Sequence, residues 1–216
     1  MTSPSSRHAH VVGLGLIGAS IALALRACGW SVTGVDADED LTATALSTGI
    51  IDATVPSTEL KVVFIATPAG AVSTIATAIL TSNVRSDLIV TDVAGVKGSI
   101  VSTIDDPRFL GGHPMAGSEQ RGLSGARDDL FRSCTWVLTP TQRTSARTYS
   151  TLHGILREFG ANVVAIGADD HDRLVAIASH VPHLLAGSLM NEASLVAEED
   201  AVLLQLAAGG FRDMTR

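Results

Sequence analysis

The sequence predicts an α/β fold, a doubly wound parallel sheet followed by an all-helical segment. Short apolar runs alternate with stretches of helical length from Ala9 to Gly167, which is the pattern of consecutive βαβ units. After Gly167 the chain has helical patterns only. We therefore predict an α/β domain over residues 7–167 and the start of a helical domain over residues 168–216.

Each predicted strand is a short run rich in aliphatic and β-branched residues, typical of strands buried on both faces of a sheet. The strands are expected at residues 9–13, 30–36, 61–68, 86–93, 108–112, 135–140 and 161–167. The predicted helices are rich in Ala, Leu and polar residues, and several end at a glycine suited to a helix C-terminus. They are expected at residues 16–28, 36–49, 71–80 and 143–159.

The helical segment is predicted to contain two helices. The first covers residues 169–194 with a kink at Pro182, and the second runs from residue 198 until Gly209 and Gly210 stop it. A segment of this size is too small to bury a core alone. We expect it to pack on the first domain, on another chain, or on residues outside this sequence.

Composition excludes several classes of function. The net charge of −7 over 216 residues disfavours electrostatic binding of nucleic acid or of an anionic membrane over a broad surface. No uninterrupted apolar run reaches the roughly 18 residues of a membrane helix, and the polar N-terminus lacks a signal-peptide core. Two cysteines, Cys28 and Cys134, are too few for a disulfide framework. We expect a cytoplasmic protein without a nucleic-acid or membrane partner.

A glycine-rich turn between the first strand and the first helix carries the first functional signal. Gly13, Gly15 and Gly18 form the pattern G-x-G-x-x-G, and Asp36 ends the next strand. This context is typical of a dinucleotide site, in which the glycines let backbone approach a pyrophosphate. Asp36 is placed to bind ribose hydroxyls and would repel a 2′-phosphate, so NAD is favoured over NADP. The alternatives are a structural glycine turn and a solvated Asp36.

Two further segments are assigned to the same cofactor site. Leu16 and Ile17 open the helix after the second glycine, where free backbone amides would face the phosphates. Thr67 and Pro68 lie at the carboxyl end of another predicted strand, on the edge of the sheet where such cofactors bind. An ordinary turn at a strand end would look the same.

The loop GGHPMAGSEQRG, residues 111–122, carries the candidate catalytic residue. His113 lies just beyond a short apolar strand, and so at the same carboxyl edge of the sheet as the cofactor. Histidine is the usual proton acceptor near neutral pH. The alternative is a structural histidine whose hydrogen bonds are satisfied.

Histidines of the helical segment raise the question of a metal site. His180 and His183 are three residues apart on one helix face, and His171 lies among aspartates upstream. This spacing matches no recognised ligand pattern, so no metal is predicted. A surface helix is the alternative for His171. Arg212 and Arg216, one helical turn apart, could anchor a carboxylate or be merely solvated.

Together these motifs resemble the prephenate/arogenate dehydrogenase family of tyrosine biosynthesis. The matching segments, in the family's order, are GLGLIGAS, ATP, TDVAGVK, GGHPMAGSEQRG, TWVLTP, HD, ASHVPH and GGFRDMTR. The resemblance implies a Rossmann domain followed by a helical domain that forms a homodimer. It also implies oxidative decarboxylation of prephenate to 4-hydroxyphenylpyruvate, or of arogenate to tyrosine, with NAD as the hydride acceptor.

The resemblance also implies roles for single residues. His113 would draw off the proton of the ring 4-hydroxyl, Arg216 would bind a substrate carboxylate, and His180 and His183 would shape the pocket. Gly95 stands where the family usually has a serine whose hydroxyl assists the histidine, so we expect a slower or reorganised site. The chain stops at the arginine of the last motif, which predicts a fragment truncated within the helical domain.

Two other functions remain open besides the choice between prephenate and arogenate. The first is a non-catalytic NAD-binding fragment of the same family, which Gly95 favours. The second is a Rossmann dehydrogenase acting on β-hydroxy acids, but those enzymes typically rely on a lysine in the helical part, and no lysine follows Lys97.

Overall fold

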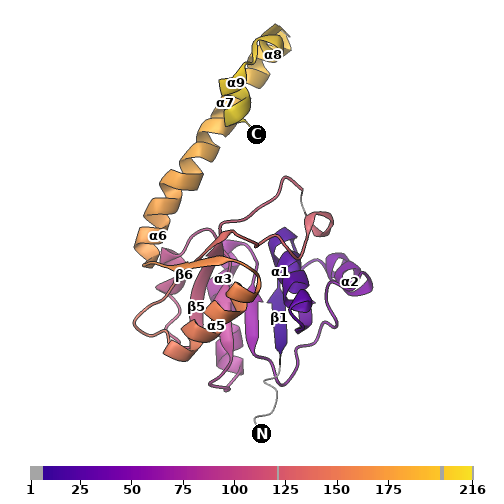
Figure 1. Ribbon diagram of the computed structural model, residues 1–216, viewed down its shortest axis with the longest axis vertical. Helices are drawn as coiled ribbons and strands as arrows, with labels where there is room; N and C mark the ends of the chain where they lie inside the picture. The colour runs from indigo at the N-terminus through magenta and orange to yellow at the C-terminus, as the bar shows by residue number, and fades with distance from the viewer. Residues whose placement is uncertain (1–6, 121, 200–201, 216) are drawn as a thin grey trace. The chain divides into compact units, whose positions relative to one another are not determined.

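Seven strands form one sheet in the order β2-β1-β3-β4-β5-β6-β7 (Figure 1). The computed structural model describes residues 7–120, 122–199 and 202–215. The chain divides into two units, Met1–His171, which contains the sheet, and Asp172–Arg216.

The first five strands are parallel, as predicted. They are β1 (His8–Val12), β2 (Ser31–Val35), β3 (Val62–Ile65), β4 (Ile89–Asp92) and β5 (Phe109–Pro114). The chain leaves β1 toward β2 on one side and later returns to β3 on its other side, so the strand order reverses at β1. In α/β sheets the crevice at such a reversal, outside the carboxyl ends of the strands, is where ligands bind.

The last two strands run opposite to the first five, which the all-parallel prediction did not include. β6 (Thr135–Thr139) pairs antiparallel with β5, and β7 (Asn162–Ala165) pairs parallel with β6. The described part of the β5–β6 connection holds only a short 3₁₀ turn, η1 (Leu123–Gly125), and no crossover helix. A parallel neighbour needs such a crossover, so the chain turns back at the carboxyl edge of β5.

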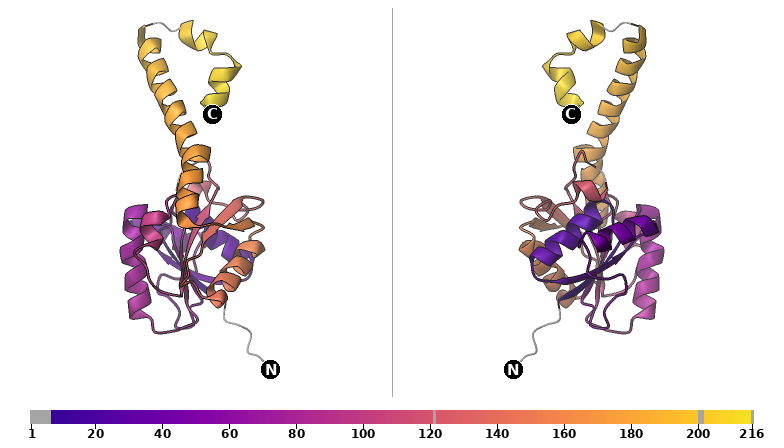
Figure 2. Two further views of the ribbon diagram at one scale, coloured as in Figure 1. Left: turned by 90° about the vertical axis from the view of Figure 1, so that its left-hand side faces the viewer. Right: turned by 90° about the vertical axis from the view of Figure 1, so that its right-hand side faces the viewer.

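Helices cover both faces of the sheet. α1 (Leu16–Ala27) and α5 (Ala146–Glu158) lie on one face, and α3 (Ala69–Ser82) and α4 (Gly98–Val101) lie on the other (Figures 1 and 2). α2 (Glu39–Ser47) lies beside β2 at the edge of the sheet (Figure 1). This arrangement confirms the predicted doubly wound architecture.

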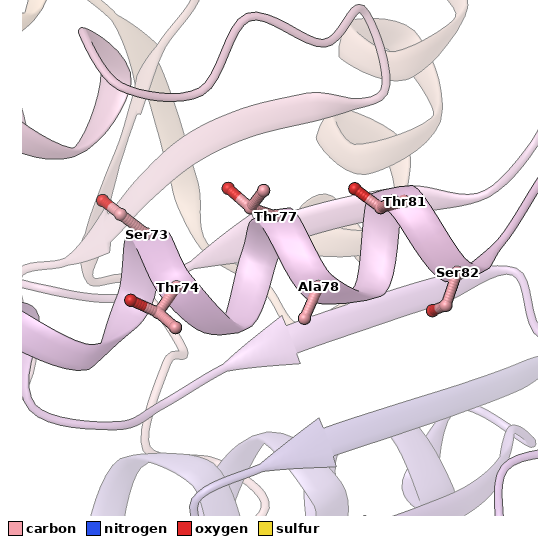
Figure 3. Close-up of a pocket in the computed structure, with 6 residues that line it drawn as sticks. All are labelled: Ser73, Thr74, Thr77, Ala78, Thr81 and Ser82. Atoms are coloured by element: carbon pink, nitrogen blue, oxygen red, sulfur yellow. The ribbon is translucent and has the colours of Figure 1, made fainter.

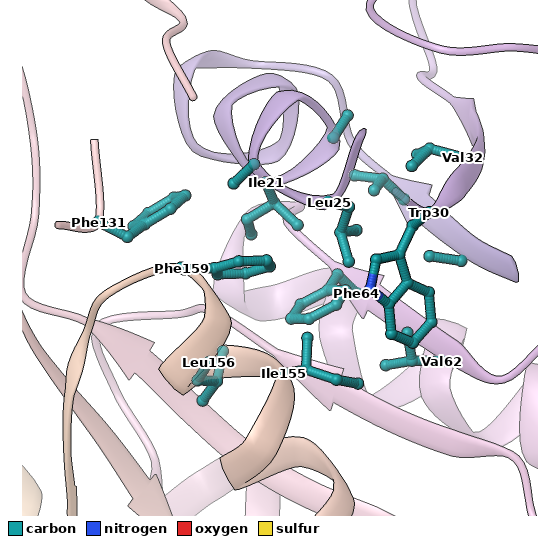
Figure 4. Packing of buried hydrophobic residues seen from close by; sticks show 14 of the residues in the cluster. Ile21, Leu25, Trp30, Val32, Val62, Phe64, Phe131, Ile155, Leu156 and Phe159 are labelled. Atoms are coloured by element: carbon teal, nitrogen blue, oxygen red, sulfur yellow. The ribbon is translucent and has the colours of Figure 1, made fainter. Parts of the chain in front are cut away.

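The larger core cluster lies under α1 and α5 and is rich in aromatic rings. Phe64 of β3, Phe131 and Phe159 meet beside Ile21 of α1 (Figure 4). The ring centroids of Phe64 and Phe159 are 6.4 Å apart, and those of Phe131 and Phe159 are 6.0 Å apart. Aromatic pairs at this separation add about 0.5–1.5 kcal/mol each beyond their buried area. The cluster therefore ties the segment before β6 to the parallel part of the sheet.

The helical segment differs in detail from the prediction. Helix α6 (Ala168–Val175) passes through a π-helical stretch, Ala176–His180, into α7 (Val181–Glu199). The π-helical stretch ends two residues before Pro182, whose nitrogen carries no hydrogen to donate into an α-helical ladder. At the position of the predicted kink the helix thus changes from α-helical to π-helical hydrogen bonding over Ala176–His180.

The two glycines predicted to stop the second helix begin another one. α8 ends at Leu206 (Val202–Leu206), and α9 covers Gly209–Met214. Ala208 has an extended backbone (φ −85°, ψ −172°) and occupies the N-cap position of α9. The turn between the helices therefore lies before the glycine pair, and the prediction placed it too late.

Among the described residues, one helical stretch is long and apolar enough to cross a membrane, by length and composition alone. It covers Ala168–Ala197, its most apolar 18-residue window has a mean hydropathy of 1.2, and 6% of that window is buried. Such a helix also suits packing against other protein.

Candidate functional site

The turn between β1 and α1 packs closely against the end of β3. Gly13 has a φ of 94°, and a Cβ atom there would lie 2.6 Å from the carbonyl oxygen of Ala66. A Cβ atom at Gly18 would lie 1.9 Å from the carbonyl oxygen of Gly13. Both positions accept only glycine, the first for its conformation and its contact and the second for its contact.

Gly15 differs from the other two glycines of the motif. Apart from its chain neighbours, no heavy atom of the described residues lies within 4 Å of its Cβ position, so the position faces open space. Gly15 is also the N-cap of α1, and no side chain caps the helix, whose first residues are Leu16 and Ile17. An open approach to an uncapped helix N-terminus is what an anionic pyrophosphate requires.

Asp36 is held against this turn. The backbone amide of Leu14 donates to its Oδ2 at 2.6 Å, and the amide of Asp38 donates to its Oδ1 at 3.0 Å. Each carboxylate oxygen has a second lone pair available for a ribose hydroxyl. Glu39 and Asp40, in the first turn of α2, add negative charge beside Asp36. This cluster disfavours a 2′-phosphate at the same place.

Thr67 and Pro68 lie between β3 and α3, as expected. The backbone nitrogen of Thr67 is 3.1 Å from the Cβ position of Gly13, so the two turns are in contact. The Oγ1 atom of Thr67 is buried and has no hydrogen-bond partner within the described ranges. A buried hydroxyl without a hydrogen-bond partner lowers the stability of the fold by about 1–3 kcal/mol. Such a hydroxyl marks a position where a ligand atom can supply the missing hydrogen bond.

His113 lies near the carboxyl end of β5 and contacts a second histidine. Its Nδ1 atom is 2.9 Å from Nε2 of His171 in α6, and the two rings are T-shaped, with centroids 5.1 Å apart. His113 is half-buried, whereas His171 is completely buried. The surface-helix alternative for His171 is therefore wrong. The sequence contained the HD pair but no sign of its burial.

Gly95 lies beside the Cε1–Nε2 edge of the His113 ring. Its Cβ position lies 3.7 Å from both Cε1 and Nε2 of His113, which is an ordinary van der Waals contact. A serine at this position would bring its hydroxyl beside Nε2. The turn after β4 is thus the place where an added side chain would meet the candidate base.

A buried ion pair joins the turn after β4 to the backbone of β5. The side chains of Asp92 and Lys97 are both completely buried, and Nζ of Lys97 contacts Oδ2 of Asp92. Nζ also donates to the carbonyl oxygen of Gly112 at 2.9 Å, and the amide of Gly112 donates to Oδ1 of Asp92 at 3.3 Å. Burial raises the pKa of the Asp92 carboxyl, and the Lys97 ammonium opposes that shift.

This ion pair fixes the position of Gly95 relative to His113. Gly95 lies between Asp92 and Lys97 in the chain, and both side chains bond to Gly112, the residue directly before His113. Sequence reasoning assigned no role to Asp92 or Lys97. Their presence in the TDVAGVK segment was the only available signal.

The remaining predicted site residues belong to the second unit. His180 ends the π-helical stretch and His183 lies in α7, both exposed, and Arg212 is exposed in α9. Arg216 lies outside the described residues. A common pocket of these side chains with His113 stays a prediction. In the part of the chain that is described, no group of three or more His, Cys, Asp or Glu could hold a metal ion.

A broad depression on α3 carries no catalytic group. It is lined by small and hydroxyl-bearing residues, Ser73, Thr74, Thr77, Ala78, Thr81 and Ser82 (Figure 3). None of the predicted site residues lines it, so the candidate site remains the carboxyl edge of the sheet.

Two family models match the chain. One is described as "Prephenate dehydrogenase, nucleotide-binding domain" and matches residues 21–165. The other is described as "Prephenate dehydrogenase, dimerization domain" and matches residues 167–216.

Curated relatives align over nearly the whole chain. A prephenate dehydrogenase of Bacillus subtilis is 34% identical over 218 residues, which cover 95% of this chain and 59% of the relative. A cyclohexadienyl dehydrogenase of Zymomonas mobilis is 31% identical over 97% of this chain and 75% of its own length. The chain therefore spans about three-fifths of the length of the Bacillus relative.

Solved structures show the same architecture. Prephenate dehydrogenase from Aquifex aeolicus, in complex with hydroxyphenyl propionate and NAD+, has a TM-score of 0.87 and 29% identity. The comparison covers 100% of this chain and 79% of that one. Arogenate dehydrogenase from Synechocystis has a TM-score of 0.77 and 33% identity, over 97% of this chain and 78% of that one.

The apolar helical stretch falls within the dimerization-domain match, where helix faces that pack on protein are expected. Both family models, the aligned relatives and the shared architecture point the same way. The chain belongs to the prephenate dehydrogenase family.

Proposed function

We propose that the chain acts as an NAD-dependent prephenate dehydrogenase, which converts prephenate to 4-hydroxyphenylpyruvate with loss of CO2. The observation that carries this proposal is the placement of His113. It lies on the same edge of the sheet as the glycine turn, with His171 at its Nδ1 atom and Gly95 at the Cε1–Nε2 edge of its ring. The relatives named prephenate dehydrogenase, and the related structure that holds NAD+ and a hydroxyphenyl acid, support it.

The residues around the glycine turn fit NAD. Gly15 leaves open space before the first turn of α1, and Asp36 offers carboxylate oxygens at the end of β2. Gly13, Leu16, Ile17, Gly18, Thr67 and Pro68 complete the proposed cofactor site. When bound there, NAD supplies the hydride acceptor that the oxidation needs.

The chain's own contribution to the chemistry is a proton acceptor in a fixed position. Nε2 of His113 accepts the proton of the ring hydroxyl while the carbon that bears this hydroxyl is oxidised. Loss of the ring carboxylate as CO2 then completes the aromatic ring. The ion pair of Asp92 and Lys97 holds the backbone of Gly112, the residue directly before this acceptor.

We assign residues 7–167 to cofactor binding and residues 168–216 to the substrate and to homodimer formation. The dimerization-domain match supports the second assignment. His180, His183 and Arg216 are proposed to contact the substrate from that part of the chain. We also propose a cytoplasmic location, supported by the free thiols Cys28 and Cys134.

Two alternatives have an observation in their favour. The Synechocystis arogenate dehydrogenase, 33% identical, favours arogenate as the substrate and tyrosine as the product. Gly95, which brings no hydroxyl to Nε2 of His113, favours a non-catalytic NAD-binding member of the family.

The test is the absorbance of NADH at 340 nm with purified protein, NAD, and either prephenate or arogenate. An increase in absorbance with prephenate alone supports the proposal. An increase with arogenate alone means that arogenate, and not prephenate, is the substrate. The control is His113→Asn, which should lose most turnover while NAD binding survives. Unchanged turnover in this variant would show that His113 is not the proton acceptor. NAD binding without turnover on either substrate would favour the non-catalytic alternative.

A further inference from the structure

The completely buried His171 has no role in the reaction as proposed so far. Its Nε2 atom is 2.9 Å from Nδ1 of His113. We propose that His171 is a positioning residue, which accepts a hydrogen bond from the Nδ1–H of His113 and thereby keeps the Nε2 lone pair of His113 available. This inference rests on the proposed role of His113 as proton acceptor.

The position of one hydrogen atom decides whether His113 can act. The 2.9 Å contact holds one hydrogen atom, so one of the facing nitrogens donates and the other accepts. A neutral imidazole carries only one N–H, so the donor ring has no hydrogen on its other nitrogen. If Nδ1 of His113 donates, Nε2 of His113 is unprotonated and can accept a proton. If Nε2 of His171 donates instead, His113 carries its hydrogen on Nε2 and has no acceptor to offer. Catalysis requires the first arrangement.

The same hydrogen bond can persist when His113 takes up a proton. His171 is 0% exposed, whereas His113 is half-buried. In the proposed arrangement the proton is added to Nε2 of His113, while its Nδ1–H continues to donate to His171. The acceptor therefore gains and loses its proton without any rearrangement of the two rings.

The backbone that carries His171 is fixed to the sheet. The amide of Ile166 donates to the carbonyl oxygen of Leu138 in β6 at 3.1 Å, and the amide of His171 donates to Gly167 at 2.9 Å. β6 itself pairs with β5 at His113. His171 and His113 thus stand on neighbouring parts of one hydrogen-bonded framework, which is what a positioning contact requires.

The experiment reads the tautomer of His113 directly. The full chain is labelled with ¹⁵N in its histidine rings, and two-bond ¹H–¹⁵N correlation spectra are recorded without substrate above the pH at which histidines titrate. The signals of His113 are those lost in His113→Asn. Two variants are compared, namely His171→Gln, whose amide oxygen can still accept, and His171→Leu, which has no acceptor.

We expect the wild type and His171→Gln to carry the His113 hydrogen on Nδ1, and His171→Leu to lose this preference. In the NADH assay we expect kcat to fall about 100-fold in His171→Leu, with a smaller change in KM and partial recovery in His171→Gln. A wild-type spectrum with the hydrogen on Nε2, or equal tautomers in the two variants, overturns the inference.

The spectrum is recorded without substrate, so the two proposals can fail separately. If His113 shows the expected tautomer and no variant or wild type turns over either substrate, the proposed function fails and the hydrogen-bond assignment stands. If His171→Leu does not fold, the wild-type spectrum and His171→Gln still decide the inference.

Discussion

Replacing Gly15 by alanine should separate dinucleotide binding from folding. Gly15 has a φ of −65° and a ψ of −171°, an extended conformation that alanine adopts without strain. Within the described part of the chain, no heavy atom beyond its neighbours in sequence lies within 4 Å of the new methyl group. We therefore expect the free energy of unfolding to change by less than about 0.5 kcal/mol. The methyl group enters the space proposed for the pyrophosphate, so the Kd for NAD should rise at least tenfold, or about 1.4 kcal/mol.

Gly18→Ala is the matched variant with the opposite expectation. Its methyl carbon would lie 1.9 Å from the carbonyl oxygen of Gly13 and 3.1 Å from Cβ of Ala66. Reaching even 3.0 Å from that oxygen requires the start of α1 and the turn to separate by about 1.1 Å. Overpacking of this kind costs about 1–3 kcal/mol or more in the free energy of unfolding.

Urea unfolding followed by circular dichroism measures the stability of both variants, and isothermal titration with NAD measures binding. The expected pattern is a stable Gly15→Ala that binds NAD weakly and a destabilised Gly18→Ala. The reasoning is refuted if Gly15→Ala binds NAD as tightly as the wild type. It is also refuted if Gly15→Ala unfolds as easily as Gly18→Ala, because the open space at Gly15 would then not exist.

Three further predictions concern the ion pair, a buried histidine and the turn after β4. Lys97→Met leaves the carboxylate of Asp92 buried without its counter-charge, so urea unfolding should show a loss of about 3–5 kcal/mol, largely recovered when Asp92→Asn is added. Burial lowers the pKa of His10 from 6.5 to about 4, so its stabilising contribution is full above pH 6.5 and is lost as the pH falls toward 4. Between pH 6.5 and pH 4 the free energy of unfolding should therefore fall by about 3 kcal/mol, and this fall should be absent in His10→Gln. Gly95→Ser should raise kcat in the NADH assay because its hydroxyl reaches Nε2 of His113, whereas Gly95→Ala should not.

The sequence by itself determined the elements whose signals are local. Alternating apolar runs and helix-ending glycines located the parallel strands and their helices, because strand and helix periodicity is set by neighbouring residues. The glycine turn could be predicted for the same reason. The φ of 94° at Gly13 and the helix that starts after Gly15 are properties of one short segment.

Only the tertiary structure decided the features that depend on distant contacts. β6 reverses direction because the chain before it stays at the edge of β5, which no periodicity within β6 records. His171 is buried against His113 across 58 residues of sequence, and the helical pattern around it is compatible with either an exposed or a buried ring. The ion pair of Asp92 and Lys97 closes on the backbone of Gly112 in another strand. Local sequence sets which helices and strands form. Only the packing of these elements decides which polar side chains are buried from solvent, and buried polar groups must then form hydrogen bonds or ion pairs with one another.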